Sequence, residues 1–152
     1  MSDTIAAIST PPGEGGIGIV RISGDRSLEI MNTLFRPCPE VVKPRYAYFG
    51  TIVDPKTGQV IDEAICIYMK APHSYTCEDV VEIQAHGGIV SIRTILRTVL
   101  DAGAEWRNRE SSPSWHSSTE EWIWSRQKRS LMSSKRRAAC RWASQRDSYR
   151  VD

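Results

Sequence analysis

The residues with the clearest chemical potential lie in a glycine-rich segment near the N-terminus, TPPGEGGIGIVRISG, residues 10–24. Gly15 and Gly16 have no Cβ, so they permit a positive φ and let a ligand approach the backbone closely. Arg21 is the one charged side chain in the β-branched run that follows, and its guanidinium can pair with a carboxylate or phosphate through two hydrogen bonds. We interpret this segment as a binding site; the alternative is a tight turn before a buried strand, with Arg21 solvated at its end.

A second polar cluster comes from the segment VVEIQAH, residues 80–86, of which residues 80–85 are strand-like. Alternation along a strand places Glu82 and Gln84 on one face, where the carboxylate can accept hydrogen bonds from the ring N–H groups of a heterocycle. His86 precedes a Gly-Gly pair and is either a positioned polar group or a structural histidine at a strand end. The candidate pocket neighbours are Gly15, Gly16, Gln84 and His86.

Several classes of site are excluded by spacing. The glycine loop lacks the lysine of a phosphate-binding P-loop, and its glycines precede a strand, whereas a dinucleotide-binding motif needs them to open a helix. The four cysteines and three histidines show no CxxC pair and no metal-ligand spacing, so we expect no metal site and free thiols. No nucleophile, base and orienting group form a set, so we assign no catalytic residue.

Short elements must position these groups. We expect strands over residues 4–9 and 18–23, with the glycine loop between them. Asp25 or Ser27 is expected to cap an amphipathic helix that carries Leu28, Ile30, Met31, Leu34 and Phe35 and ends before the breaker at residues 37–39.

Further along, two β-rich runs, 45–53 and 60–69, flank a turn-like segment and predict a hairpin. A strand over 80–85 is then followed by a Gly-Gly turn and a helix over about 89–102, which Gly103 is expected to stop. Hairpin and single helices together predict an α+β domain with a small mixed or antiparallel sheet and two or three helices.

The composition changes near residue 106. Residues 1–106 hold nine Lys and Arg against thirteen Asp and Glu, whereas residues 107–152 hold eleven against five, so the overall formal charge of +2 is the sum of a negative and a positive part. Four of the five tryptophans fall in the second part, which has few aliphatic residues for a core. We expect one small domain in 1–106 and a disordered or marginally helical tail in 107–152. Because no signal peptide or membrane-spanning run is evident, we expect a cytoplasmic protein.

The TPPGEGGIGIVRISG segment, the APHSYTCEDVVEIQAHGG block and the spacing between them closely resemble the N-terminal domain of the MnmE (TrmE) family of GTPases, which modify the wobble uridine of tRNA. The resemblance covers about residues 3–106. It implies a fold similar to the tetrahydrofolate-binding domains of one-carbon enzymes, homodimerisation through residues 1–106, and binding of 5-formyl-tetrahydrofolate as the one-carbon source. By motif, Arg21 and Glu82 match folate-contacting positions, and Cys77 stands where the family usually has Gly, which would strain a turn that needs a positive φ.

For the full-length family, the resemblance further implies GTP, Mg and K in a GTPase domain, and the partners MnmG, with its FAD and NADH, and tRNA. This chain carries no motif of that domain, so we expect it to be inactive alone. A third folate contact, a basic residue in an LNGR-like motif, is missing, and we therefore expect weakened folate binding.

The tail, residues 107–152, is expected to be out-of-frame translation of the same gene. Family members continue with a stretch like AEPGEFTKRAFLNGRMDL. Residues 121–124, Glu-Trp-Ile-Trp, can be written GAA-TGG-ATT-TGG. In the shifted frame this contains ATG-GAT-TTG, which encodes Met-Asp-Leu. Residues 106–113 can likewise be encoded so that the shifted frame reads Ala-Glu-Pro-Gly-Glu-Phe-Thr. Loss of one G after codon 106 would produce this pattern.

Two alternatives to the folate module remain. In the first, the chain is a small basic nucleic-acid-binding protein, because basic runs at 126–129 and 135–137 are interleaved with tryptophans. Binding driven by the tail would weaken steeply with salt and vanish on deletion of residues 107–152. In the second, it is an acid/base enzyme that uses Glu82 and His86, which activity surviving Glu82→Ala would exclude.

Overall fold

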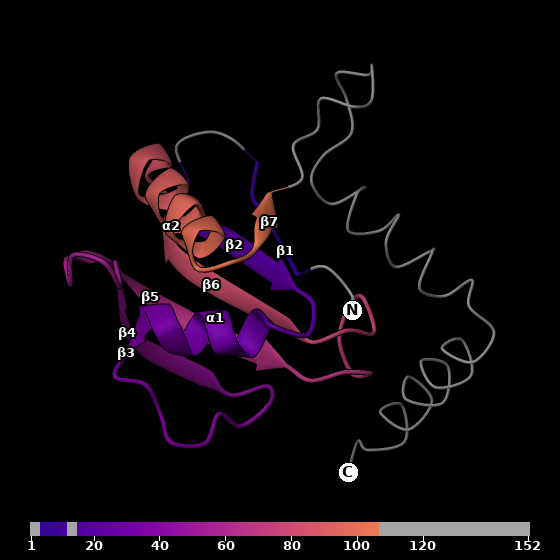
Figure 1. The fold of residues 1–152 in the computed structure, drawn as a ribbon. Helices are drawn as coiled ribbons and strands as arrows, with labels where there is room; N and C mark the ends of the chain where they lie inside the picture. The colour runs from indigo at the N-terminus through magenta and orange to yellow at the C-terminus, as the bar shows by residue number, and fades with distance from the viewer. Residues whose placement is uncertain (1–3, 12–14, 107–152) are drawn as a thin grey trace, which may run out of the picture.

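Alternating β-branched residues build a single mixed sheet in the computed structural model, which describes residues 4–11 and 15–106 (Figure 1). The strand order is β3-β4-β5-β6-β2-β1-β7, and neighbours are antiparallel except β1 and β7, which are parallel. The strands are β1 (Ile5–Ile8), β2 (Ile17–Ser23), β3 (Phe35–Arg36), β4 (Ala47–Val53), β5 (Val60–Met69), β6 (Val80–His86) and β7 (Glu105–Trp106). The helices are α1 (Ser27–Leu34) and α2 (Ile89–Asp101). The predicted α+β class, mixed sheet and number of helices are confirmed for these residues.

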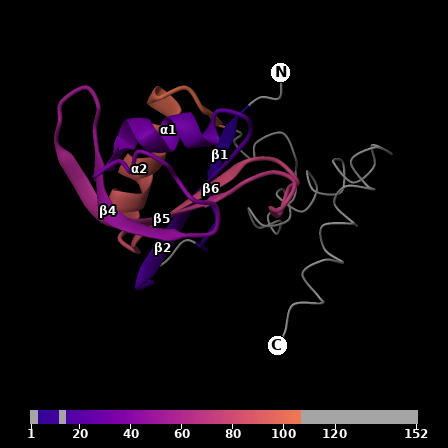
Figure 2. The same cartoon turned by 90° about the horizontal axis from the view of Figure 1, so that it is seen from below.

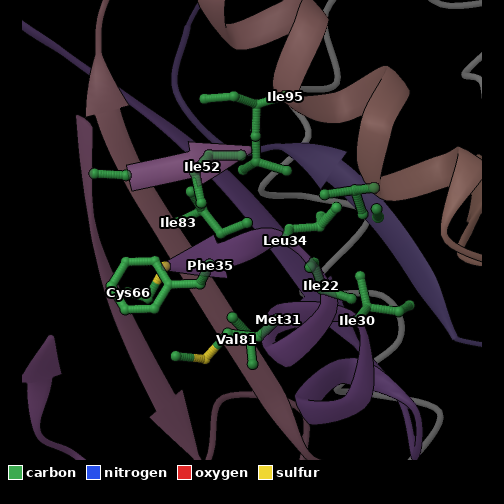
Figure 3. Packing of buried hydrophobic residues seen from close by; sticks show 14 of the residues in the cluster. Ile22, Ile30, Met31, Leu34, Phe35, Ile52, Cys66, Val81, Ile83 and Ile95 are labelled. Atoms are coloured by element: carbon green, nitrogen blue, oxygen red, sulfur yellow. The ribbon is translucent and has the colours of Figure 1, made fainter. Parts of the chain in front are cut away.

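Both helices lie against the same face of the sheet (Figures 1 and 2). The core between them is apolar, and Val20 and Ile22 of β2 and Val81 and Ile83 of β6 are fully buried in it. Figure 3 shows how helix and strand side chains interdigitate there. Since strand side chains alternate between faces, Arg21 and Glu82 point to the opposite face, which the helices leave open. We call this surface the open face.

Most of the predicted elements are present. The expected hairpin is formed by β4 and β5, and Gly103 follows α2 with a positive φ of 111°. The predicted cap of α1 is wrong: Arg26 occupies that position without a side-chain cap, and the buried Ser27 hydroxyl has no hydrogen-bond partner among the described residues. Phe35 does not extend the helix but begins β3, because pairing with Ile52 of β4 gives its backbone an extended partner. The short strands β3 and β7 were not predicted.

The cysteines only partly match the expectation of free thiols. Cys38 and Cys66 are free, and burial raises the pKa of the Cys66 thiol to about 12. Cys77 takes part in a disulfide, which corrects the expectation there. Cys140 and the rest of the basic tail lie outside the described residues. Neither described helix is long and apolar enough to cross a membrane.

Candidate functional site

Arg21 and Glu82 meet on the open face as an ion pair, which we call the Arg21–Glu82 pair. They are directly opposite in the register of β2 and β6, so a single ladder position brings them together. Arg21 donates from Nε to Glu82 Oε1 over 2.9 Å and also from Nη2 to the same oxygen. The side chains keep only 17% and 10% of their exposure, so the pair is largely desolvated. Arg21 is therefore not solvated at a strand end.

The pair leaves one donor and one acceptor for a ligand. Both Arg21 hydrogen bonds end on Oε1, and among the described residues neither Arg21 Nη1 nor Glu82 Oε2 has a hydrogen-bond partner. A guanidinium N–H beside a carboxylate oxygen can bind a group that presents an acceptor and a donor side by side. Such a group is the C(=O)–NH edge of a flat heterocycle.

A loop between β5 and β6, residues 70–79, folds back over this end of the open face. The Ser23 hydroxyl fixes the loop: it lies 3.0 Å from the Thr76 hydroxyl and donates to Glu78 Oε2 over 3.1 Å. Ser23, Thr76 and Glu78 are all buried. The loop places the Tyr75 ring over the Arg21 guanidinium, with 4.8 Å between Cζ and the ring centroid. This is a cation–π contact on a tethered loop.

The tethered loop contains the strained residue expected at Cys77, whose φ is 57°. A Cβ in this left-handed region is unfavourable, and glycine is the residue that adopts it without cost. The turn around it is closed by hydrogen bonds from Cys77 N to Ser74 O over 3.4 Å and from the Ser74 hydroxyl to Glu78 O.

His86 lies at the other end of β6, close to the glycine loop. Its Nδ1 is 2.8 Å from Asp62 Oδ1, and its side chain is 71% exposed. The hydrogen bond that the Asp62 carboxylate accepts, the charge of that carboxylate and the charge of Glu63 raise the pKa of His86. The glycine loop reaches this end because Gly87 lacks a Cβ: an added one would lie 1.8 Å from Gly15 O.

The predicted site residues therefore form two groups. Glu82 and Arg21 are together at one end, whereas Gly15, Gly16 and His86 lie at the other, with Gln84 between them opposite Ile19. At about 3.3 Å per strand residue, Glu82 and His86 are about 13 Å apart. The structure thus joins the two principal predicted residues and places the predicted neighbours farther along the same strands.

Three contributors were missed by sequence reasoning: Tyr75, Ser23 and Asp62. Tyr75 and Ser23 depend on the loop folding back across the sheet, which no local pattern reveals. Asp62 had only a weak signal, as an acidic residue in a β-rich run. In residues 4–11 and 15–106 no cluster of three or more His, Cys, Asp or Glu is placed to hold a metal ion.

Comparison with known proteins gives a consistent picture. The family model described as "GTP-binding protein TrmE N-terminus" matches residues 4–111. The chain is 56% identical over 106 residues to the tRNA modification GTPase MnmE of Syntrophus aciditrophicus, covering 68% of this chain and 23% of that protein. It is 49% identical over 108 residues to the protein of the same name from Alkaliphilus oremlandii, with coverage of 68% and 23%. The chain thus spans less than a quarter of the length of these relatives.

Proposed function

The chain belongs to the TrmE N-terminal domain family, and on that premise we propose that residues 4–106 are a folate-binding module of a tRNA-modification protein. The ligand is 5-formyl-tetrahydrofolate, which supplies a one-carbon unit for the wobble uridine. Relatives at 49–56% identity bear the name tRNA modification GTPase MnmE, which supports the tRNA-modification part of this proposal. GTP hydrolysis with Mg and K, and work with MnmG on tRNA, are proposed only for the full-length family protein.

The Arg21–Glu82 pair carries the folate part of the proposal. The pterin ring of the ligand is a flat heterocycle with ring N–H donors beside a carbonyl oxygen. Glu82 Oε2 would accept from such a donor, and Arg21 Nη1 would donate to the carbonyl. Because the pair is largely desolvated, these hydrogen bonds are stronger than they would be in water.

Calorimetric titration of the full chain with 5-formyl-tetrahydrofolate tests this assignment. We expect saturable binding by the native chain and at least a tenfold loss in Glu82→Gln, which keeps the side-chain shape but removes the charge. Arg26→Ala is the matched control, because Arg26 forms an exposed ion pair with Glu29 on the α1 side. A folded chain that binds no folate would overturn the proposal.

We also propose that the module forms a homodimer through the open face. Phe49 of β4 is 69% exposed and lies directly opposite Ile65 of β5, which is 38% exposed, so two large apolar side chains adjoin on the open face. Burial of such a patch favours association. Phe49→Asp should give a monomer by light scattering, whereas Val41→Asp, at an exposed apolar residue outside the strands, should not. A native chain that is monomeric at all concentrations would contradict this.

We further propose that residues 107–152 are translated out of frame. The change of charge and tryptophan content after residue 106, and the codons that fit a shifted family sequence, support this origin. Sequencing of the coding DNA should reveal a continuation of the family sequence one nucleotide out of phase. A downstream frame without such a continuation would contradict the proposal. Nucleic-acid binding by the tail is not proposed, because it depends on residues outside the described part.

A further inference from the structure

Tyr75 is a half-exposed aromatic ring held beside the site by a fixed loop. Its exposed fraction is 53%, and one face of its ring covers the Arg21 guanidinium. A tyrosine that served only as packing would be expected to bury more of its ring. The exposed part is therefore available to a bound molecule.

The loop holds this ring in place before any ligand arrives. The neighbouring residue, Thr76, is only 1% exposed and hydrogen-bonds to Ser23 of β2. The ends of the loop are tied by two further bonds, from Ala71 N to Asp79 Oδ1 over 2.8 Å and from Gly24 N to Asp79 O over 2.9 Å. Since the backbone is already ordered, a ligand that contacts Tyr75 does not have to order the loop.

The open atoms of the pair lie next to the ring. Glu82 occupies the Nε and Nη2 side of the Arg21 guanidinium, and Tyr75 covers one of its faces, so the Nη1 side remains for a ligand. A heterocycle bound by its edge to Arg21 Nη1 and Glu82 Oε2 would lie alongside the exposed surface of Tyr75. Contact between two aromatic systems is favourable and does not depend on hydrogen-bond pattern.

We propose that Tyr75 is a third ligand-contacting residue of the Arg21–Glu82 site and forms an aromatic wall against the ring of the bound heterocycle. This inference rests on the proposed folate-binding function. The pair forms hydrogen bonds with the edge of the heterocycle, and contact with Tyr75 favours a ligand whose ring is flat. The site therefore requires the pterin part of the folate, and p-aminobenzoylglutamate, which lacks that part, does not bind.

The test is calorimetric titration of the full chain and its variants with 5-formyl-tetrahydrofolate. Tyr75→Phe keeps the ring and should bind within about twofold of the native chain. Tyr75→Ala should bind about tenfold more weakly. Tyr46→Ala is the control, because Tyr46 is similarly exposed at 56% but packs against Tyr48, with ring centroids 4.9 Å apart and the rings tilted by 56°. If Tyr75→Ala keeps the native affinity while Glu82→Gln still loses binding, the proposed role of Tyr75 is refuted and the folate proposal is retained.

Other outcomes also decide between the two proposals. Absence of folate binding by the folded native chain would overturn both. Saturable binding of p-aminobenzoylglutamate with equal affinity would overturn both pterin binding by the Arg21–Glu82 pair and the role of Tyr75. If Tyr75→Ala disturbs the loop, intermolecular nuclear Overhauser effects between ligand and Tyr75 ring protons replace it, with assignment from Tyr75→Phe. Their absence in a saturated complex would overturn the inference.

Discussion

Arg21 and Glu82 are separated by 61 positions in the chain, yet they face each other across one rung of the β2–β6 ladder. The position of each residue in the alternation along its strand fixes its face, and the register fixes its partner. An ion pair at this place links the two halves of the sheet on the side opposite α1 and α2.

The pair should be energetically coupled. Arg21→Ala leaves a largely buried carboxylate without its cation, and Glu82→Ala leaves the reverse, so each single change should destabilise the fold more than its own lost contacts imply. A double-mutant cycle by urea unfolding should give a coupling free energy of about 1 to 3 kcal/mol. Additivity within about 0.5 kcal/mol would contradict the pair's contribution.

Gly87 should tolerate no side chain. In Gly87→Ala the new methyl group would lie 1.8 Å from Gly15 O, which is a backbone atom and cannot rotate away. We expect a loss of roughly 1 to 3 kcal/mol in the free energy of unfolding. Gly16→Ala is the matched control, since a Cβ there would have nothing within 4 Å and should change stability by less than about 0.5 kcal/mol. Equal effects in the two variants would refute this explanation.

The contact between His86 and Asp62 should depend on pH. The raised pKa of folded His86 lies above the usual 6.5, so the stabilisation is fully present below about pH 6.5 and is lost as pH rises through the raised value. In an NMR titration, Asp62→Asn should lower the pKa of His86. Asp101→Asn should leave it unchanged, because Asp101 pairs instead with Lys56. A His86 titration that does not respond to Asp62→Asn would show that the pair does not form in solution.

Cys77→Gly should stabilise the loop when measured in a reductant, so that the disulfide makes no contribution. Glycine removes the cost of a Cβ at a φ of 57°, partly offset by its larger unfolded-state entropy, and a gain of about 0.5 to 1 kcal/mol is expected. Cys77→Ala keeps the Cβ and should bring no gain. Similar stability of the two variants in urea unfolding would argue against strain at this position.

Local patterns predicted the elements well but not their assembly. The alternation in residues 80–85 placed Val81, Ile83 and Ala85 on the buried face and Glu82 on the other, as the structure has them. The pairing of β6 with β2 depends on packing between residues far apart in the chain, so a short sequence segment does not predict it. Phe35 illustrates the same limit: the helical pattern predicted it in the helix, but it pairs with Ile52 of β4 as a strand residue.

The site was predicted to a similar extent. Arg21 and Glu82 were identified from their motifs, but their hydrogen bond to each other depends on the strand register. Tyr75 reaches the site only because the hydroxyl of Ser23 anchors a distant loop. Contacts of this kind arise from the tertiary folding of an irregular segment, and such a segment has no hydrophobic periodicity from which its path could be predicted.

The parallel pairing of β1 with β7 joins the first and last described strands, and Glu105 N donates to Thr4 O over 2.8 Å. The two ends of the folded region therefore lie side by side. A linker of a few residues could connect them and new termini could be opened in the exposed turn at 54–59, giving a circular permutant with the same sheet. During synthesis, in contrast, this edge of β1 stays uncovered until residue 106 has left the ribosome, so β1 is one of the last strands to gain both of its neighbours.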